Sequence, residues 1–386
     1  MIPYGRQDIN RDDINAVVNV LQSDWLTQGP AVPLFEKTVA QYAGVDYAIA
    51  INSATSALHI ACLALGVGAG DYVWTSPNTF VASANCALYC GAKVDFVDID
   101  PNTYNLSPSQ LRKKLANSKN EGKLPKLVIV VHLAGQSCEM EEISKLSKEY
   151  GFKVIEDASH AIGGSYLEHK IGGCQFSDIT VFSFHPVKII TTGEGGMATT
   201  NNPELAKKMQ LFRSHGITSA LDDMDPRPSH QIWNYQQVEL GFNYRMTDLQ
   251  AALGISQMKR IDSFVEKRHQ IANRYNQELK DLPLTLPFQN SDTYSSFHLY
   301  LIRLQTDRAK LSQKELYQSM LESNIRVNIH YIPVYLQPYF KNLGFKPGHS
   351  PEAEKYYEEV LSIPMYPSLS TIEQDFVINT LRNLLG

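Results

Sequence analysis

Lys188 and Asp157 are the two residues of this sequence that could do chemistry together. Lys188 stands between the apolar runs Ile179–Phe184 and Val187–Ile190, and Asp157 follows the short apolar run that starts at Val154. An amine among apolar residues loses its proton more readily, and a neutral lysine attacks carbonyl carbon to form a Schiff base. A carboxylate can keep a pyridine nitrogen protonated. Either residue alone would more often be structural, but the pair predicts an enzyme that uses pyridoxal phosphate.

A second segment has the residue types of a phosphate site. Asn52-Ser-Ala54-Thr55-Ser56-Ala follows the predicted strand Tyr47–Ile51 and opens a predicted helix. Small residues let the backbone approach an anion, and the free N–H groups of a helix start can bind it. The hydroxyls of Thr55 and Ser56 add donors. The alternative is an ordinary Ser/Thr helix cap. Because Asp157 and Lys188 follow strands of the same predicted sheet, we favour the phosphate site.

Three further residues lie near these segments, and each has two interpretations. Phe80 follows a predicted strand end and could stack on a pyridine ring or belong to the core. His160, three residues beyond Asp157, could hydrogen-bond the phenolic oxygen of the cofactor or only orient Asp157. Ser183, five residues before Lys188, could donate to the cofactor phosphate or only end its strand.

The elements that must position these residues alternate between β-rich and helical patterns. The β-rich runs are Tyr47–Ile51, Tyr72–Thr75, Lys93–Val97, Leu127–Val131, Lys153–Ile155, Asp178–Phe184 and Gly196–Thr200. The helical patterns between them are Thr55–Leu65, Val81–Tyr89, Ser109–Ala116 and Glu141–Tyr150. This alternation predicts an α/β fold with a mostly parallel sheet covered by helices on both faces. Ligands bind at the carboxyl ends of such strands, so Asp157 and Lys188 are expected to face one crevice.

The remaining segments predict the N-terminal helices and a second domain. Residues 10–13 resemble a helix start, and apolar residues then recur with helical spacing, which predicts one buried face of Ile14, Val17, Val18 and Leu21. The other predicted elements are helices at Pro33–Tyr42 (ending at Gly44), Ala206–Phe212, Thr247–Asn276, Gln313–Ser323 and Thr371–Leu385, and strands at Phe297–Leu304 and Arg326–Ile329. We place a large domain at residues 1–258 and a smaller α+β domain at 259–386. An exposed acidic loop is predicted at Ala220–Asp225, followed by Pro226-Arg-Pro228.

The composition indicates an ordinary globular protein. The chain has 386 residues, with 43% hydrophobic and 19% charged residues and a formal net charge of −5. This charge gives no general attraction to nucleic acid or to an anionic membrane, and no apolar run is long enough to span a bilayer. The N-terminus lacks the features of a signal peptide, so we expect a cytoplasmic protein. Five cysteines show no metal-ligand spacing, so we expect free thiols and no metal.

The motifs resemble those of the DegT/DnrJ family of sugar aminotransferases over nearly the whole chain. They are Asn52-Ser-Ala-Thr-Ser, Glu156-Asp-Ala-Ser-His160, Ser183-Phe-His-Pro-Val-Lys188, Phe212-Arg-Ser-His-Gly216, Gly241-Phe-Asn-Tyr-Arg-Met-Thr-Asp and His330-Tyr-Ile-Pro333. The resemblance implies the aspartate-aminotransferase fold (fold type I of pyridoxal phosphate enzymes), with a large mixed-sheet domain and a small C-terminal domain. It also implies a homodimer with shared active sites.

Residue roles follow from the resemblance position by position. Lys188 would carry the cofactor, Asp157 would pair with its ring nitrogen and His160 would lie beside its oxygen. Phe80 would stack on the ring, and the phosphate would bind Ala54, Thr55, Ser183 and, from the other subunit, Asn243. The nucleotide-sugar site would consist of Tyr4, Asp24, Trp25, Leu26, Thr27, Ala54, Ser183, Asn243, His330, Tyr331, Ile332 and Pro333.

The resemblance also implies a reaction. The motifs are most similar to the branch of the family that transfers an amino group from L-glutamate to a UDP-linked 4-keto-6-deoxy-N-acetylhexosamine in pseudaminic acid synthesis. The product is UDP-4-amino-4,6-dideoxy-N-acetyl-β-L-altrosamine. One alternative is another keto sugar nucleotide, of the bacillosamine or perosamine type, and the loop Ile217–Tyr235 bears on this choice. The other is a non-catalytic regulatory relative, which the intact pair of Lys188 and Asp157 argues against.

Overall fold

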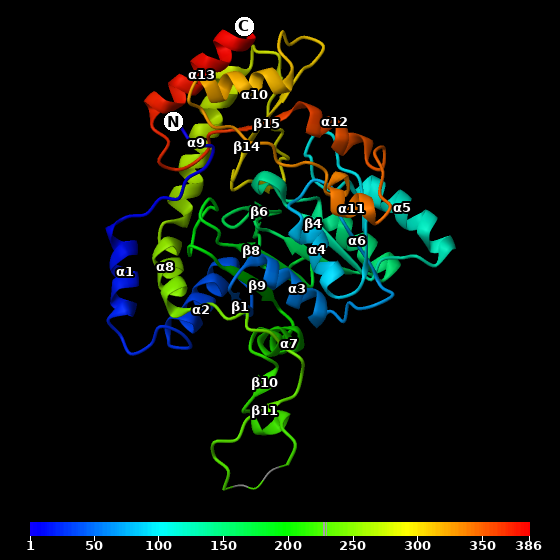
Figure 1. Ribbon diagram of the computed structural model, residues 1–386, viewed down its shortest axis with the longest axis vertical. Helices are drawn as coiled ribbons and strands as arrows, with labels where there is room; N and C mark the ends of the chain where they lie inside the picture. Colours follow the sequence, from blue (N-terminus) through cyan, green and yellow to red (C-terminus); the bar gives the residue numbers. More distant parts are fainter. Residues whose placement is uncertain (227, 229) are drawn as a thin grey trace.

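The computed structural model of the chain, which describes residues 1–226, 228 and 230–386, is built on one seven-stranded sheet (Figure 1). The strand order is β1-β9-β8-β5-β4-β2-β3. β9 is antiparallel to both of its neighbours, and the strands from β8 to β3 are parallel to one another. The predicted α/β fold with a mostly parallel sheet is confirmed. The strands are β1 (Tyr47–Ile51), β2 (Tyr72–Thr75), β3 (Lys93–Phe96), β4 (Leu127–Val131), β5 (Lys153–Asp157), β8 (Ile179–Ser183) and β9 (Gly196–Thr200).

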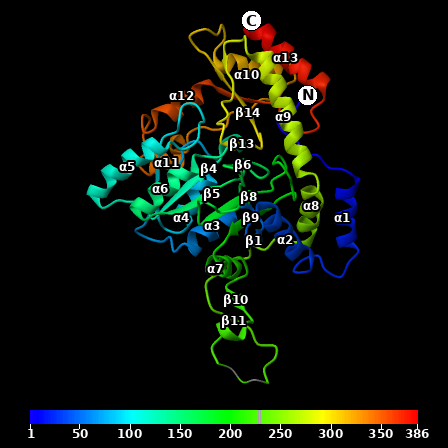
Figure 2. The same ribbon diagram turned by 180° about the vertical axis from the view of Figure 1, so that it is seen from behind.

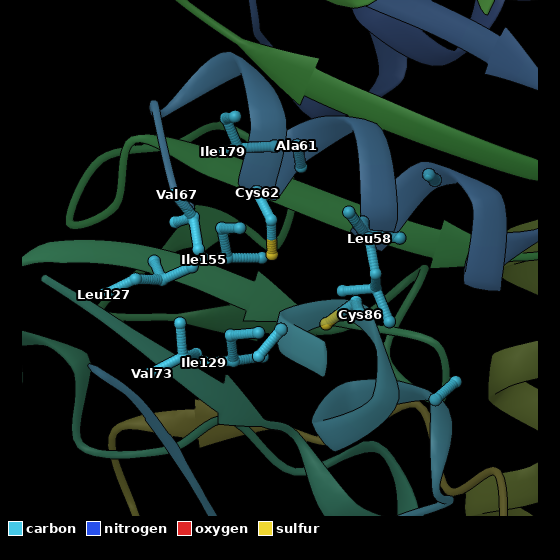
Figure 3. Packing of buried hydrophobic residues seen from close by; sticks show 14 of the residues in the cluster. Leu58, Ala61, Cys62, Val67, Val73, Cys86, Leu127, Ile129, Ile155 and Ile179 are labelled. Carbon is cyan, nitrogen blue, oxygen red and sulfur yellow. The ribbon is translucent and has the colours of Figure 1, made fainter. Parts of the chain in front are cut away.

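Helices cover both faces of this sheet because each face is a layer of apolar side chains. On one face lie α3 (Ala54–Ala64), α4 (Ala82–Tyr89) and α7 (Pro203–Arg213). Figure 3 shows Leu58 and Cys62 of α3 and Cys86 of α4 packed over Ile129 and Ile155 of the sheet. The other face is covered by α2 (Ala31–Ala43), α5 (Pro108–Glu121), α6 (Met140–Tyr150) and α8 (Asp248–Met258). α2 ends at Gly44, as predicted, where a φ of 69° suits glycine.

The C-terminal part has its own sheet and its own core. Its antiparallel strands are β12 (Leu284–Thr285), β14 (Tyr300–Leu304) and β15 (Val360–Ile363), and the helices that pack in its core are α9 (Ile261–Leu279), α10 (Gln313–Glu322) and α13 (Thr371–Leu385). α11 (Pro338–Asn342) packs its Phe340 in the core of the large sheet, and α12 (Pro351–Glu359) packs beside Tyr104 and Leu301. The strand predicted at Arg326–Ile329 is wrong, because this segment makes only the isolated bridge of Asn328 with Ser362. The predicted division at residue 258 stays a prediction, since α9 packs its first turns on the large sheet and its later turns in the C-terminal core.

Short elements complete the fold. A small sheet joins β6 (Ser165–Tyr166), β7 (His169–Lys170) and β13 (Thr293–Tyr294), and 3₁₀ turns lie at Leu133–Gly135, Leu221–Asp223 and Val334–Leu336. The N-terminal segment docks on the C-terminal part: Ile2 N–H donates to Asn324 O (2.8 Å), and Met365 N–H donates to Tyr4 O (3.0 Å). This docking places Tyr4 between the two parts of the chain.

Helix α1 (Arg11–Leu21) forms where predicted, but its apolar face points outward. Its buried residue is Asp13, whose Oδ2 accepts hydrogen bonds from Gln257 Nε2 of α8 (2.8 Å) and from Arg260 (2.5 Å). The predicted buried face is therefore wrong for the single chain, because α1 turns its polar side to α8. The outward residues Ile14, Val18 and Leu21 are 46%, 38% and 57% exposed.

A narrow arm between α7 and α8 extends away from the body of the molecule (Figures 1 and 2). It contains the antiparallel pair β10 (Ile217–Thr218) and β11 (Gln236–Gln237). The predicted acidic loop at 220–225 lies in it and is exposed in part, while residues 227 and 229 of the following segment lie outside the described residues. The arm carries the exposed apolar side chains Leu221, Ile232, Trp233, Tyr235 and Leu240.

Two features are absent from the described part of the chain. Across residues 1–226, 228 and 230–386, no helix combines the length and the apolar character that a membrane crossing needs. No group of three or more His, Cys, Asp or Glu side chains in the same residues is arranged to hold a metal ion. All five cysteines are free.

Candidate active site

A cavity of about 650 Å³ opens at the carboxyl ends of β5 and β8, between the large sheet and the C-terminal part. This volume is in the range of small-molecule sites. The predicted residues that line it are Tyr4, Ala54, Thr55, Phe80, Asp157, His160, Ser183, Lys188, His330, Tyr331 and Ile332. Asp157 and Lys188 thus share one cavity, as predicted, together with residues from both ends of the chain.

Lys188 lies in the turn that follows β8, where its N–H donates to His185 O (2.9 Å). Burial in the cavity wall lowers the pKa of Lys188 to about 8, although the negative charge of Asp157 opposes this shift. A substantial fraction of the amine is therefore neutral near pH 8. This is the state in which a lysine attacks a carbonyl carbon.

Asp157 is the last residue of β5 and is almost completely buried. Its backbone is fixed by the sheet, since His132 N–H donates to Asp157 O (3.1 Å). Its side chain accepts hydrogen bonds from Ser83 Oγ (2.5 Å) and from Ser159 Oγ (2.6 Å). A buried carboxylate with such donors can stay ionised and hold a positive charge on a ligand.

His160 is held as a neutral imidazole of one tautomer. Its Nδ1 accepts from Ala134 N–H (3.3 Å), so the ring proton lies on Nε2, which is 3.2 Å from the Tyr331 hydroxyl oxygen. Burial, and then the charges of Lys188 and His330, hold the pKa of His160 well below its ordinary value. The ring of His298 lies 4.4 Å from that of His160 between centroids. The single Nε2–H donor therefore points at the Tyr331 hydroxyl, which lines the cavity.

The start of α3 forms another wall of the cavity. Ser53 caps the helix, with its Oγ accepting from Ser56 N–H (3.1 Å), so the ordinary cap is present. Ala54 and Thr55 nevertheless line the cavity, as does Ser183. The start of α3 can lie this close to β9 because residue 196 is glycine: a Cβ atom there would lie 2.6 Å from Ala54 N. The first turn of α3 can thus serve an anion as well as its own cap.

These residues fit pyridoxal phosphate. Lys188 supplies an amine of lowered pKa for the aldehyde, and Asp157 supplies a carboxylate for the ring nitrogen. The exposed ring of Phe80 (60% exposed) lines the same cavity, and the α3 start can bind a phosphate.

Some predicted site residues do not lie on the cavity of their own chain. Asp24, Trp25, Leu26 and Thr27 form an exposed loop after α1. Asn243 is exposed, with its carbonyl oxygen 3.5 Å from Asn52 Nδ2, and Pro333 is buried beside the cavity. His330 lines the cavity, but Ser362 Oγ and Asn328 Nδ2 lie within 2.6 and 3.3 Å of its ring nitrogens. The substrate roles given to these residues stay predictions.

The structure adds residues that the sequence did not single out. Ser159 was within reach of prediction, because it belongs to the motif that ends at His160. Ser83 stands alone in an apolar helical stretch and gave no signal. Polar residues that line the cavity, as Ser83 does not, and that were not predicted include Thr79, His185, Glu194, His298, Asn328 and Gln337.

Comparison with known proteins agrees with this fold. Residues 7–382 match the model of the DegT/DnrJ/EryC1/StrS aminotransferase family. Over the whole chain, the sequence is 41% identical to the UDP-4-amino-4,6-dideoxy-N-acetyl-beta-L-altrosamine transaminase of Campylobacter jejuni and 38% identical to the spore coat polysaccharide biosynthesis protein SpsC of Bacillus subtilis, covering 98% and 97% of these proteins. The structure resembles that of PseC from Helicobacter pylori, an aminotransferase involved in the biosynthesis of pseudoaminic acid, with a TM-score of 0.90, 31% identity and coverage of 100% of this chain and 99% of the other.

The fold and the cavity therefore define a pyridoxal-phosphate-dependent sugar aminotransferase. The chain belongs to the DegT/DnrJ/EryC1/StrS aminotransferase family. A Streptococcus pneumoniae relative of similar fold, 29% identical with a TM-score of 0.88 over 99% of this chain and 98% of its own, has been solved in its PLP form. This supports the cofactor that the lysine and carboxylate pair predicts.

Proposed function

We propose that this enzyme transfers the amino group of L-glutamate to C4 of a UDP-linked 4-keto-6-deoxy-N-acetylhexosamine, giving UDP-4-amino-4,6-dideoxy-N-acetyl-β-L-altrosamine. The observation that carries the choice of sugar is the 41% identity, over the whole chain, to the Campylobacter jejuni transaminase of that name. A second strain's protein of the same name is 40% identical over the same length. The similarity to the Helicobacter pylori aminotransferase supports a place in pseudaminic acid synthesis.

A second candidate is another keto sugar nucleotide. The spore coat polysaccharide biosynthesis protein is 38% identical over the whole chain, nearly as similar as the altrosamine transaminases. Lys188 and Asp157 would serve either substrate, so other residues of the pocket would have to make the choice, and Tyr4 and Tyr331 line it.

Lys188 and Asp157 carry the central steps of the proposed reaction. Pyridoxal phosphate, when bound, supplies the aldehyde that accepts the amino group and a ring that accepts electrons. Lys188 Nζ holds the cofactor and, once released, removes the α-proton of L-glutamate. In the second half-reaction, the same amine delivers a proton to C4 of the sugar. Asp157 keeps the ring nitrogen protonated. The pKa of about 8 suits Lys188 to move protons in both directions near neutral pH.

The other proposed roles concern binding. Because Ala134 N–H occupies Nδ1, His160 would donate to the cofactor oxygen from Nε2–H, in place of its contact with the Tyr331 hydroxyl. Phe80 would cover one face of the ring. The phosphate would be held by Ala54 and Thr55 at the start of α3 and by Ser183, all of which line the cavity.

We further propose a homodimer in which each active site uses both chains. Lys188 is the only lysine or arginine among the lining residues of the described chain, yet the proposed substrates carry carboxylates and a diphosphate. A second copy could supply the missing positive charge together with Asn243, which is exposed. The outward apolar face of α1 and the apolar side chains of the arm are surfaces that a second copy would cover.

The substrate assignment is tested by a turnover screen. The purified enzyme with L-glutamate is offered a panel of UDP- and dTDP-linked 4-keto sugars, and kcat/KM is measured for each. We expect the UDP-linked 4-keto-6-deoxy-N-acetylhexosamine of the altrosamine configuration to be preferred. Preference for a dTDP sugar or for another configuration would reject this assignment but keep the enzyme class.

Shared sites are tested by mixing two inactive variants, Lys188→Ala and Asn243→Asp. A mixed dimer has one site with both lesions and one with neither, so partial activity should return after subunit exchange. Absence of recovery after verified exchange would place Asn243 in the site of its own chain.

A further inference from the structure

Hydroxyl groups from two different elements hold Asp157. Ser159, two residues beyond it, donates to Oδ1 from its hydroxyl (2.6 Å) and from its backbone N–H (3.2 Å). Ser83, in α4, donates its hydroxyl to Oδ2 (2.5 Å). Ser83 is completely buried. Both carboxylate oxygens are therefore fixed by protein groups, Oδ1 by Ser159 on the cavity wall and Oδ2 by Ser83 behind it.

The hydroxyls of Thr79 and Ser83 form a chain of hydrogen bonds to Asp157 in which each hydroxyl donates toward the carboxylate. An ionised carboxylate has only acceptors, so Ser83 uses its single hydroxyl proton on Asp157. Ser83 Oγ is also 2.8 Å from Thr79 Oγ1, and in this contact Thr79 must be the donor. The relay runs from Thr79 through Ser83 to Asp157. Successive buried hydrogen bonds of this kind polarise and strengthen one another.

The same turn of chain carries Phe80. Ser83 N–H donates to Phe80 O (3.3 Å) and Asn85 N–H donates to Val81 O (2.8 Å), so residues from Phe80 onward form the helical start of α4. Thr79 and Phe80 both line the cavity. One turn therefore presents an aromatic ring to the cavity and connects to the carboxylate of Asp157.

We propose that Thr79 and Ser83 are positioning residues that act through Asp157 in the aminotransferase reaction. The inference rests on the proposed role of Asp157 as partner of the ring nitrogen. With Ser159 on one oxygen and Ser83 on the other, the carboxylate plane is fixed and its remaining lone pairs are left for a ligand. The relay also spreads the negative charge of Asp157, which sets how strongly the carboxylate attracts the ring proton.

Thr79 offers a matched pair of variants. Thr79→Val keeps the shape and removes the hydroxyl, whereas Thr79→Ser keeps the hydroxyl and removes a methyl group. We expect Thr79→Val to slow the single-turnover reaction with L-glutamate roughly fivefold, as loss of one hydrogen bond in a relay to a charged group would do. KM should change less than about twofold in both variants, because Thr79 is almost completely buried and its hydroxyl is used on Ser83. The pH dependence of the visible absorbance of the bound cofactor should shift in Thr79→Val only. Equal behaviour of the two variants would overturn the relay.

A double-mutant cycle separates the relay from the role of Asp157. Ser83→Ala is measured in the parent enzyme and in Asp157→Asn, by cofactor affinity in titrations of the cofactor-free protein and by single-turnover rate. Thermal unfolding of each cofactor-free variant checks that it folds. We expect Ser83→Ala to cost roughly tenfold in the parent and less than about twofold in Asp157→Asn, because residues that act as a unit are not additive.

The outcomes of the cycle are distinct. A parent-like Ser83→Ala beside an impaired Asp157→Asn overturns the relay alone. The same loss for Ser83→Ala in both backgrounds also overturns the relay, because Ser83 would then act independently of Asp157. A parent-like Asp157→Asn overturns the proposed role of Asp157 and the relay with it.

Discussion

At the scale of single residues, the burial of Lys188 makes its amine more reactive but lowers the free energy of unfolding. Burial lowers its pKa from 10.5 to about 8, so the folded protein favours the neutral amine more than the unfolded chain does. The unfolded chain binds more protons between these two values, and stability should therefore rise with pH from about 8 to about 10.5. Below pH 8 the full destabilisation from burying the charged amine is present. It is on the order of 2 kcal/mol once screening by solvent in the cavity is allowed for.

Lys188→Met removes this cost, because methionine has a similar shape and no charge. In the cofactor-free protein, we expect the variant to be more stable than the parent at pH 7 and to match it near pH 10.5. Urea unfolding across this pH range measures the difference. A difference that does not shrink as the pH rises through this window would show that the amine is not desolvated.

At the scale of elements, the start of α3 and strand β9 depend on each other. Gly196 lies so close to the first turn of α3 that a Cβ atom would meet the backbone of Ser53 and Ala54 at 2.5 and 2.6 Å. Gly196→Ala must push this turn away, and with it the N–H groups proposed to bind the phosphate. We expect cofactor affinity to fall by roughly tenfold or more, the loss of one or two charged hydrogen bonds. Fluorescence titration of the cofactor-free protein with pyridoxal phosphate measures the change.

The matched control is Gly68→Ala, at a glycine with no atom within 4 Å of the added Cβ. This variant should bind the cofactor like the parent. If the two glycine variants bind it equally well, the α3 start does not hold the phosphate.

The same elements show how far the sequence could predict the structure. The predicted bounds of strands β1 and β4 match the structure at both ends. An apolar run bounded by polar residues indicates both the length of a strand and its burial. The outward face of α1 could not be predicted, since amphipathic spacing shows that a face is apolar but not what covers it. Arg326–Ile329 has strand composition but makes only the isolated bridge of Asn328 with Ser362. In both cases the outcome depends on which distant segments of the chain pack against the element, and the local sequence does not contain this information.

Some residues of the candidate site could be predicted from the sequence and others could not. Lys188, Asp157 and His160 carry their chemistry in their type and in the strand ends before them. Ser83 does not, because a single serine in a helix has no pattern and acquires its role only when α4 packs beside β5.

At the scale of the whole molecule, the α1 face bears on assembly. Its outward residues include Val18, and Trp25 and Leu26 follow in the exposed loop. Val18→Asp places a charge on this face, which would be desolvated if a second copy covers it. We expect weaker dimerisation by at least roughly tenfold, from the cost of burying a charge. Analytical ultracentrifugation measures the dissociation constant.

Ile372→Asp, at an 81% exposed position of α13, is the control and should leave assembly unchanged. A Val18→Asp variant that associates like the parent would remove α1 from the interface. Loss of activity that follows the monomer fraction would support shared sites.

The central claim is that Lys188 holds pyridoxal phosphate at the crevice it shares with Asp157. Borohydride reduction of the cofactor-loaded protein, followed by peptide mapping, tests this claim most directly because it makes the attachment permanent. We predict the pyridoxyl group on the peptide containing Lys188, and no labelling when L-glutamate is added first in excess. A label on another lysine, or none on the yellow loaded protein, would contradict the account.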